Sequence, residues 1–145
     1  MKRIMIASVM AALLGTTALA DTSSMSTTAT GMGVLENDYV KAGVNGTTGT
    51  LGSGGNVSPG LLYDSTGTGT FNTGYDYLTP GSPFDGFSVK VDGTNYTNNN
   101  TGSAGITGDG NGLTDGDGTL SWSGSVTSVF DITNTYSLGT TSEYI

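Results

Sequence analysis

The sequence predicts an all-β protein, either an antiparallel β-sandwich or a partial, supersandwich-like sheet, with glycine-rich loops. Composition is the first reason: the 145 residues include 25 glycines, while the helix-favouring residues Glu, Lys, Arg and Gln are nearly absent. The second reason is a series of short apolar runs separated by turn residues. The third is the strict apolar–polar alternation of some of these runs, which matches the period of a strand.

Residues 1–20 have the features of a cleavable secretory signal peptide. Lys2 and Arg3 form its positive start, residues 4–14 are apolar, and Ala18-Leu19-Ala20 is a small-x-small cleavage site. The apolar stretch is shorter than the roughly 18 residues of a membrane span. We therefore expect a mature chain that begins at Asp21, has no membrane span and is secreted, periplasmic or held at the cell surface.

The mature chain divides into a polar leader and one β-rich domain. Residues 21–32 are rich in Thr and Ser and are expected to be flexible, and residues 33–145 form the domain. The segment 33–44 predicts two strands separated by a polar break at Asn37-Asp38. Short apolar runs bounded by glycine follow at 48–52 and 60–64. The segments 69–72 and 75–78 are candidate short strands, and a Pro/Gly turn follows at 79–83.

The second half of the domain contains the clearest strand signals. In "FSVKV" (87–91) Phe87, Val89 and Val91 share one face, and Asp92-Gly93 predicts a two-residue hairpin turn before a return strand at 94–97. Residues 98–118 are expected to form a long loop. Strands are expected again at 119–122 and 125–138, with one mainly apolar face formed by Val126, Phe130, Ile132, Tyr136 and Leu138.

Aromatic residues gather in the middle of the chain. We expect Tyr63, Tyr75, Tyr77, Phe84 and Phe87 to supply core packing in a protein that is short of leucine. The alternative is that exposed tyrosines stack on sugar rings, as they do in carbohydrate-binding modules.

Charge and residue usage exclude several function classes. All twelve acidic residues follow Ala20, whereas the only basic residues after it are Lys41 and Lys90. The mature chain is therefore strongly acidic, and nucleic acid is not an expected partner. There is no histidine and no cysteine, which excludes disulfides, Ser-His-Asp and Cys-His catalysis and ordinary zinc sites. We expect no enzyme activity, no catalytic residue and no cofactor other than a weakly bound calcium ion.

Carboxylates are the catalytic groups that remain. A glycosidase pair from Glu36, Asp38, Asp64, Asp76 and Asp85 stays an alternative. The favoured interpretation is that Asp76 and Asp85 stabilise the turns around residues 79–83 through Asx-type hydrogen bonds from their side chains to the backbone.

The segment "DGNGLTDGDG" (109–118) predicts a weak calcium site. Asp109, Asn111, Asp115 and Asp117 offer hard oxygen ligands on a glycine-rich string. An EF-hand is excluded, because Leu113 or Thr119 would take the fifth position in the two available registers. A solvated loop in which Asp and Asn tolerate left-handed turns is the alternative.

Several motifs within residues 33–92 resemble known proteins. "VLENDYVKAGV", "GTLGSGG", "PGLLYD" and "YDYLTPGSPFDGFSV" resemble the N-terminal β-rich region of large exported bacterial surface proteins. The segment 35–41 is also similar to the start of mutarotase-like supersandwich domains of carbohydrate-active enzymes. Mutarotase-like catalysis implies a histidine and a carboxylate on later strands, so no functional residue carries over to this chain.

The resemblance implies an exported structural or surface-interaction β-protein whose partners are other β-domains of the same or a neighbouring chain. A truncated carbohydrate-binding or mutarotase-like carbohydrate-active domain, with carbohydrate as its ligand, is the alternative. Two interpretations of the chain's extent stay open. It is either the N-terminal part of a longer protein or a short protein that pairs its exposed strands with another copy.

Overall fold

The computed structural model describes residues 22–25, 31–52, 59–78, 85–116 and 118–139. Within these ranges the regular elements are antiparallel strands and one 3-10 turn, η1 (Thr73–Tyr75). The predicted all-β class is confirmed. The predicted signal peptide and the predicted turn at 79–83 lie outside the described residues.

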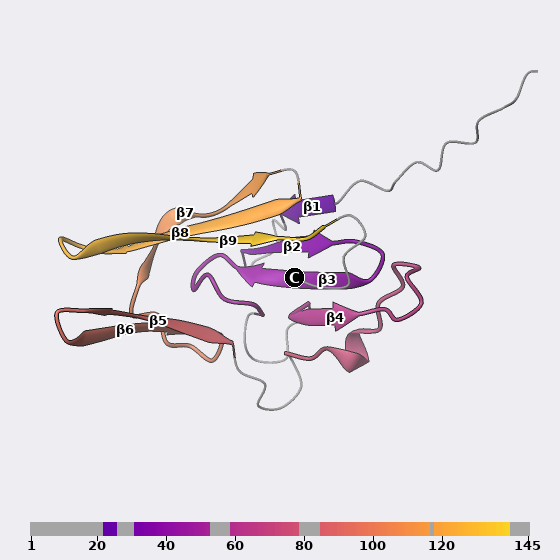
Figure 1. Cartoon of the computed structure of the whole chain (residues 1–145), viewed down its shortest axis with the longest axis horizontal. Helices are drawn as coiled ribbons and strands as arrows, with labels where there is room; N and C mark the ends of the chain where they lie inside the picture. Colours follow the sequence, from indigo (N-terminus) through magenta and orange to yellow (C-terminus); the bar gives the residue numbers. More distant parts are fainter. Residues whose placement is uncertain (1–21, 26–30, 53–58, 79–84, 117, 140–145) are drawn as a thin grey trace, which may run out of the picture.

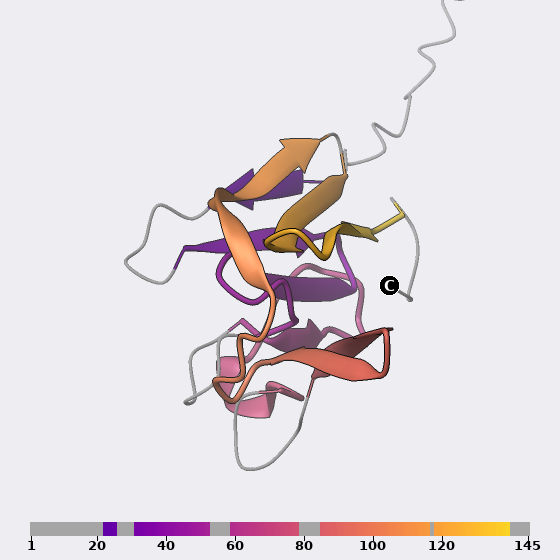
Figure 2. The same cartoon turned by 90° about the vertical axis from the view of Figure 1, so that its left-hand side faces the viewer.

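The strands form three antiparallel sheets. The first has the order β1 (Thr22–Met25), β2 (Met32–Glu36), β3 (Val40–Asn45) and β4 (Leu61–Tyr63). The second is the hairpin of β5 (Gly86–Val91) and β6 (Thr94–Asn99). The third has the order β7 (Thr107–Gly116), β8 (Thr119–Val126) and β9 (Phe130–Ser137). In Figure 1 the third sheet lies above the β5–β6 hairpin, and Figure 2 shows the four strands of the first sheet stacked from β1 to β4.

Two turns form where the sequence predicts them. The Asn37 side-chain oxygen accepts hydrogen bonds from the backbone N–H groups of Tyr39 and Val40, both at 2.8 Å, and so ends β2 and starts β3. Asp92 and Gly93 both have positive φ, 49° and 84°, as the tight turn of a two-residue hairpin requires. The predicted strand pair 33–44 and the predicted hairpin 87–97 are therefore confirmed.

Several expectations differ from the structure. The strand boundaries expected at 119–122 and 125–138 are wrong, because β8 continues to Val126 and a turn at 127–129 separates it from β9. The loop expected at 98–118 is wrong, because β7 occupies ten of those residues and pairs with β8. The segments 69–72 and 75–78 are not strands, because the chain there turns through η1. Part of the expected polar leader, Thr22–Met25, is strand β1, whose backbone pairs with β2.

The core lies between the sheets, so the fold is a sandwich as predicted. Its buried apolar residues are Leu35, Val40, Val44, Ile106, Leu113, Leu120, Trp122 and Leu138. The β5–β6 hairpin covers the third sheet through two edge-to-face ring pairs, Phe87 with Trp122 at 5.8 Å and Tyr96 with Phe130 at 5.4 Å between ring centroids. The predicted apolar face of residues 126–138 packs against this core.

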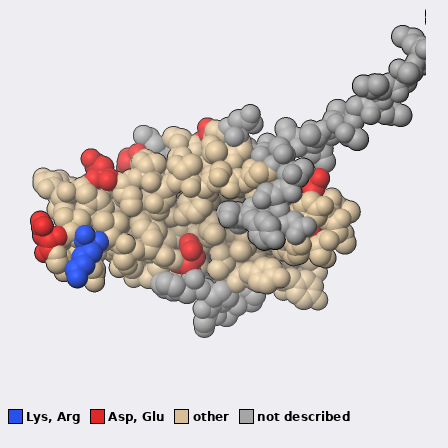
Figure 3. All heavy atoms as spheres, in the orientation of Figure 1, with Lys and Arg blue, Asp and Glu red and all other residues tan. Residues whose placement is uncertain are grey.

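Hydroxyl groups line the outer faces of the sheets. Ser121 pairs with Thr135 and Ser123 with Thr133 across β8 and β9, at 2.9 Å and 3.1 Å, and Ser88 pairs with Thr97 at 2.7 Å. Charged groups are sparse on the face shown in Figure 3, where the blue basic atoms are confined to the end that carries the β5–β6 hairpin. The face shown in Figure 3 is thus only thinly charged, and the hydroxyl pairs lie on the second and third sheets.

Candidate interaction surface

Three tyrosines are exposed beside β4. Tyr63 at the end of β4 is 43% exposed, Tyr75 at the end of η1 is 77% exposed, and Tyr77 is 61% exposed. We call these three residues the tyrosine surface. Their predicted place in the core is wrong, whereas Phe87 does pack against the core as predicted. Phe84 lies outside the described residues.

A buried carboxylate fixes the backbone that carries these tyrosines. Asp76 is 2% exposed and accepts hydrogen bonds from the backbone N–H groups of Gly60 at 2.7 Å, Leu61 at 2.9 Å and Leu78 at 2.9 Å. The Tyr77 N–H also donates to the Leu61 carbonyl oxygen at 2.8 Å. The segment after η1 is therefore held beside β4. The bond from Leu78 is the Asx-type bond predicted for Asp76, whereas the turn at 79–83 lies outside the described residues.

A second carboxylate organises the loop that follows β4. Both oxygens of Asp64 accept hydrogen bonds from the backbone and hydroxyl groups of Thr66 and Thr68 and from the backbone of Thr70, at distances of 2.5–3.1 Å. Gly67 and Gly69 between these threonines have positive φ, 64° and 70°, which lets the loop curl around the carboxylate. The Thr66 hydroxyl, followed by the Thr66 amide, holds the pKa of Asp64 well below its usual value.

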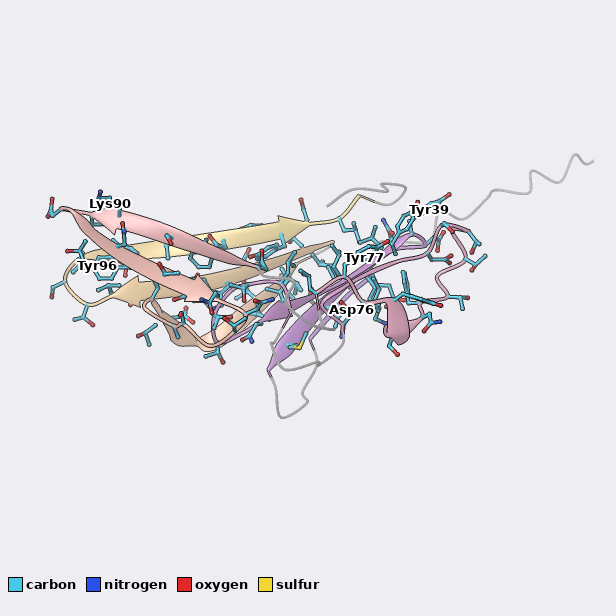
Figure 4. All side chains as sticks on the ribbon, turned by 90° about the horizontal axis from the view of Figure 1, so that it is seen from below. Tyr39, Asp76, Tyr77, Lys90 and Tyr96 are labelled. Atoms are coloured by element: carbon cyan, nitrogen blue, oxygen red, sulfur yellow. The ribbon has the colours of Figure 1, made fainter. Side chains whose placement is uncertain are left out.

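The loop is also anchored to β3. The Tyr39 ring lies so close to Gly67 that any side chain at this position would overlap it. Lys41 pairs with Glu36 at 2.6 Å, and its ammonium nitrogen lies 5.8 Å from the centre of the Phe71 ring. Figure 4 shows Tyr39, Asp76 and Tyr77 toward one end of the molecule, far from Lys90 and Tyr96.

This arrangement suits binding by contact. A tyrosine ring presents an apolar face and one hydroxyl, so each of these exposed rings can stack against a ligand and hydrogen-bond to it. Asp64 and Asp76, which the sequence left open as members of a glycosidase pair, direct their oxygens at backbone and threonine donors. Asp85 likewise accepts a hydrogen bond from the Leu51 N–H at 2.6 Å, a contact across 34 positions of sequence. The turn at 79–83 that Asp85 was predicted to stabilise lies outside the described residues.

The predicted calcium ligands lie along β7 and after it. Gly108 pairs with Gly124 and Leu113 with Trp122, so residues 109–112 bulge from the ladder. Asp109 and Asp115 are exposed. The side chains of Asn111 and Asp117 lie outside the part of the chain that the structure describes. Within that part no three His, Cys, Asp or Glu side chains gather as a metal site, and calcium binding stays a prediction.

Comparison with known proteins gives no relative. No family model, no curated protein and no solved structure matches the chain. Among the described residues, no helix has the length and apolar character needed to cross a membrane.

Proposed function

We propose that this chain is an exported structural or surface-interaction β-protein without catalytic activity, and that the tyrosine surface is its contact face. The observation that carries the proposal is the exposure of Tyr63, Tyr75 and Tyr77, from 43% to 77%, on a backbone tied down by Asp76. Large rings are normally buried, and an ordered exposed group of them is typical of interaction sites. The signal peptide predicted for residues 1–20 supports export, and the resemblance to bacterial surface proteins supports a β-domain as the partner.

A carbohydrate ligand is the second candidate. The same exposed rings favour it, because the apolar face of a sugar ring can stack on a tyrosine while its hydroxyls hydrogen-bond to nearby polar groups. Thr73 and Asn72 supply such polar groups on the same exposed turn. This candidate keeps the tyrosine surface as the site and differs from the first only in the ligand.

Retention on isolated cell envelopes tests both candidates. The exported protein should bind envelopes of the producing cell, and Tyr75→Ser plus Tyr77→Ser should reduce retention at least tenfold. Val129→Ala is the matched control, because Val129 is also an exposed apolar residue, at 43%, but lies on the β8–β9 turn. Protease treatment of the envelopes should abolish binding to a protein partner, and periodate treatment should abolish binding to carbohydrate.

Two results would contradict the proposal. Equal retention of the tyrosine variant and the wild type would remove the tyrosine surface as the contact face. N-terminal sequencing of the cell-associated protein that finds Met1 in place of Asp21 would remove export through a cleaved signal peptide.

A further inference from the structure

The outer edge of β9 is open. Among the described strands β9 pairs only with β8, through an uninterrupted register from Val126–Phe130 to Thr119–Ser137. The strand is eight residues long. In Figure 4 its open edge faces the same side of the molecule as β5. A long unpaired edge presents a row of backbone donors and acceptors to any other extended strand.

The hydrogen-bond pattern between β8 and β9 determines which backbone groups of β9 point to the open side. The Leu138 N–H donates to the Gly118 carbonyl oxygen at 3.2 Å, so even-numbered residues of this segment bond toward β8. In an antiparallel pair the bonded residues alternate. The N–H and C=O groups of Asp131, Thr133, Thr135 and Ser137 therefore point to the open side.

Among the described strands, four other edge strands have features that discourage pairing, and β9 has none of them. The edge strands β4 and β1 have only three and four residues, and β7 is interrupted by its bulge. The β5 edge carries Lys90, a charge that discourages pairing. β9 has no proline, no lysine and no register shift, and Asp131 is its one charged residue.

The β9 sequence is complementary to itself. When two copies pair antiparallel about Asn134, Thr133 faces Thr135 of the second copy and Ile132 faces its Tyr136, each combination occurring twice. Hydroxyl pairs and pairs of a β-branched with an aromatic residue both stabilise cross-strand contacts. Asp131 faces Ser137, and the two Asp131 carboxylates lie about 20 Å apart along the strands, beyond the screening length of about 8 Å.

We propose that a second copy of this chain docks antiparallel on β9, centred on Asn134, and extends the third sheet into a continuous six-stranded sheet. The outward groups of residues 131, 133, 135 and 137 then all find partners, and a register centred on Thr133 would pair fewer of them. The serine–threonine rows on β8 and β9 continue across the seam on the outer face. This inference depends on the sheet and not on the tyrosine surface.

A single-cysteine experiment reads the register directly, because the natural chain has no cysteine. In the proposed register the two Asn134 residues form a non-hydrogen-bonded pair with Cα atoms about 4.5 Å apart, within disulfide range. The exported Asn134→Cys protein should form a covalent dimer under mild oxidation. Thr133→Cys should crosslink at least tenfold less, because each copy of residue 133 is offset by about 7 Å along the strand.

Mass measurement by light scattering supplies the second test. The exported wild-type protein should be a dimer at a concentration of about 100 μM, at which even a weak dimer forms. Thr133→Lys plus Thr135→Lys should raise its dissociation constant at least tenfold, because four ammonium groups would meet at the seam. Ser88→Lys, a matched change on the exposed face of the edge strand β5, should leave the dimer intact.

Circular dichroism of each variant confirms that the sheet is retained. A monomeric mass for the wild type would overturn the proposal, as would equal crosslinking at residues 133 and 134. Both results are independent of envelope retention, so failure here leaves the proposed function standing, and the reverse also holds.

Discussion

The indole N–H of Trp122 donates a hydrogen bond to the carbonyl oxygen of Gly46 at 3.0 Å, across 76 positions of sequence. Trp122 belongs to β8 and is fully buried, whereas Gly46 begins the turn that follows β3. Tyr136 on β9 repeats this connection by donating its hydroxyl to the Gly49 carbonyl oxygen at 2.7 Å. The turn after β3 thus joins the first sheet to the third.

Gly49→Ala should be strongly destabilising. Gly49 has φ +63°, and an added Cβ would overlap the Trp122 ring. We expect a loss of about 3 kcal/mol in the free energy of unfolding, from left-handed strain of about 1 kcal/mol and overpacking of about 2 kcal/mol. Gly69→Ala is the control, because Gly69 has φ +70° but open space around it, and it should lose only about 1 kcal/mol. Urea unfolding followed by circular dichroism measures both, and equal losses would contradict the packing argument.

Asn98→Ala tests the junction of the hairpin with the core. The Asn98 side chain is fully buried, donates to the carbonyl oxygens of Thr48 and Ile106 at 2.9 Å and 3.0 Å, and accepts from the Ile106 N–H at 2.8 Å. Truncation to alanine leaves these buried backbone groups without a hydrogen-bond partner, so we expect a loss of about 3 kcal/mol in the free energy of unfolding. Asn95→Ala on the exposed part of β6 should change stability by less than about 0.5 kcal/mol. A loss below about 1 kcal/mol for Asn98→Ala, measured in the same urea titration, would sink this account.

Local signals predicted much of the fold. The Asn37 turn and the Asp92-Gly93 hairpin are decided by residues adjacent in sequence, and there the structure agrees with the prediction. β7 was missed because its glycine- and aspartate-rich sequence has low strand propensity. Its strand state depends on pairing with β8, where Leu113 lies beside Trp122, and that pairing leaves no local signal.

The exposure of the three tyrosines was only the alternative interpretation of the sequence, for a related reason. The alternation of apolar and polar residues in "YDYL" suggested a strand. In the structure the buried carboxylate of Asp76 accepts hydrogen bonds from the backbone N–H groups of Gly60 and Leu61, more than ten residues away. This long-range contact turns Tyr75 and Tyr77 outward. The neighbouring loop did leave a signal in the sequence. The alternating "TGTGT" that follows Asp64 could have predicted a loop folded around this carboxylate, because threonines spaced by glycine can donate hydrogen bonds to it.

Asp64→Asn should destabilise the protein in a pH-dependent way. The folded-state pKa of Asp64 is depressed, so its carboxylate contributes stability above its unfolded pKa of about 4, and that contribution is lost as pH falls through the folded value. The variant should melt several degrees lower than the wild type at pH 6, with the gap narrowing steadily below pH 4. Asp92→Asn removes the same charge in a turn that also accepts Asn, and should melt like the wild type. A gap that stays constant from pH 6 to pH 2 would contradict the assignment.

Tyr136→Phe should make the stability of the protein less dependent on pH above pH 10. Burial, with a smaller effect of the Asp85 charge, raises the pKa of Tyr136 to about 12. The folded state therefore retains the phenolic proton after the unfolded state has lost it, near pH 10. The stability that Tyr136 contributes is fully present below pH 10 and falls between pH 10 and pH 12. The melting temperature should fall less steeply across this pH range for Tyr136→Phe than for the wild type. Tyr77→Phe, on the exposed surface, should give the same curve as the wild type. Parallel curves for all three proteins would show that the Tyr136–Gly49 bond does not govern the alkaline transition.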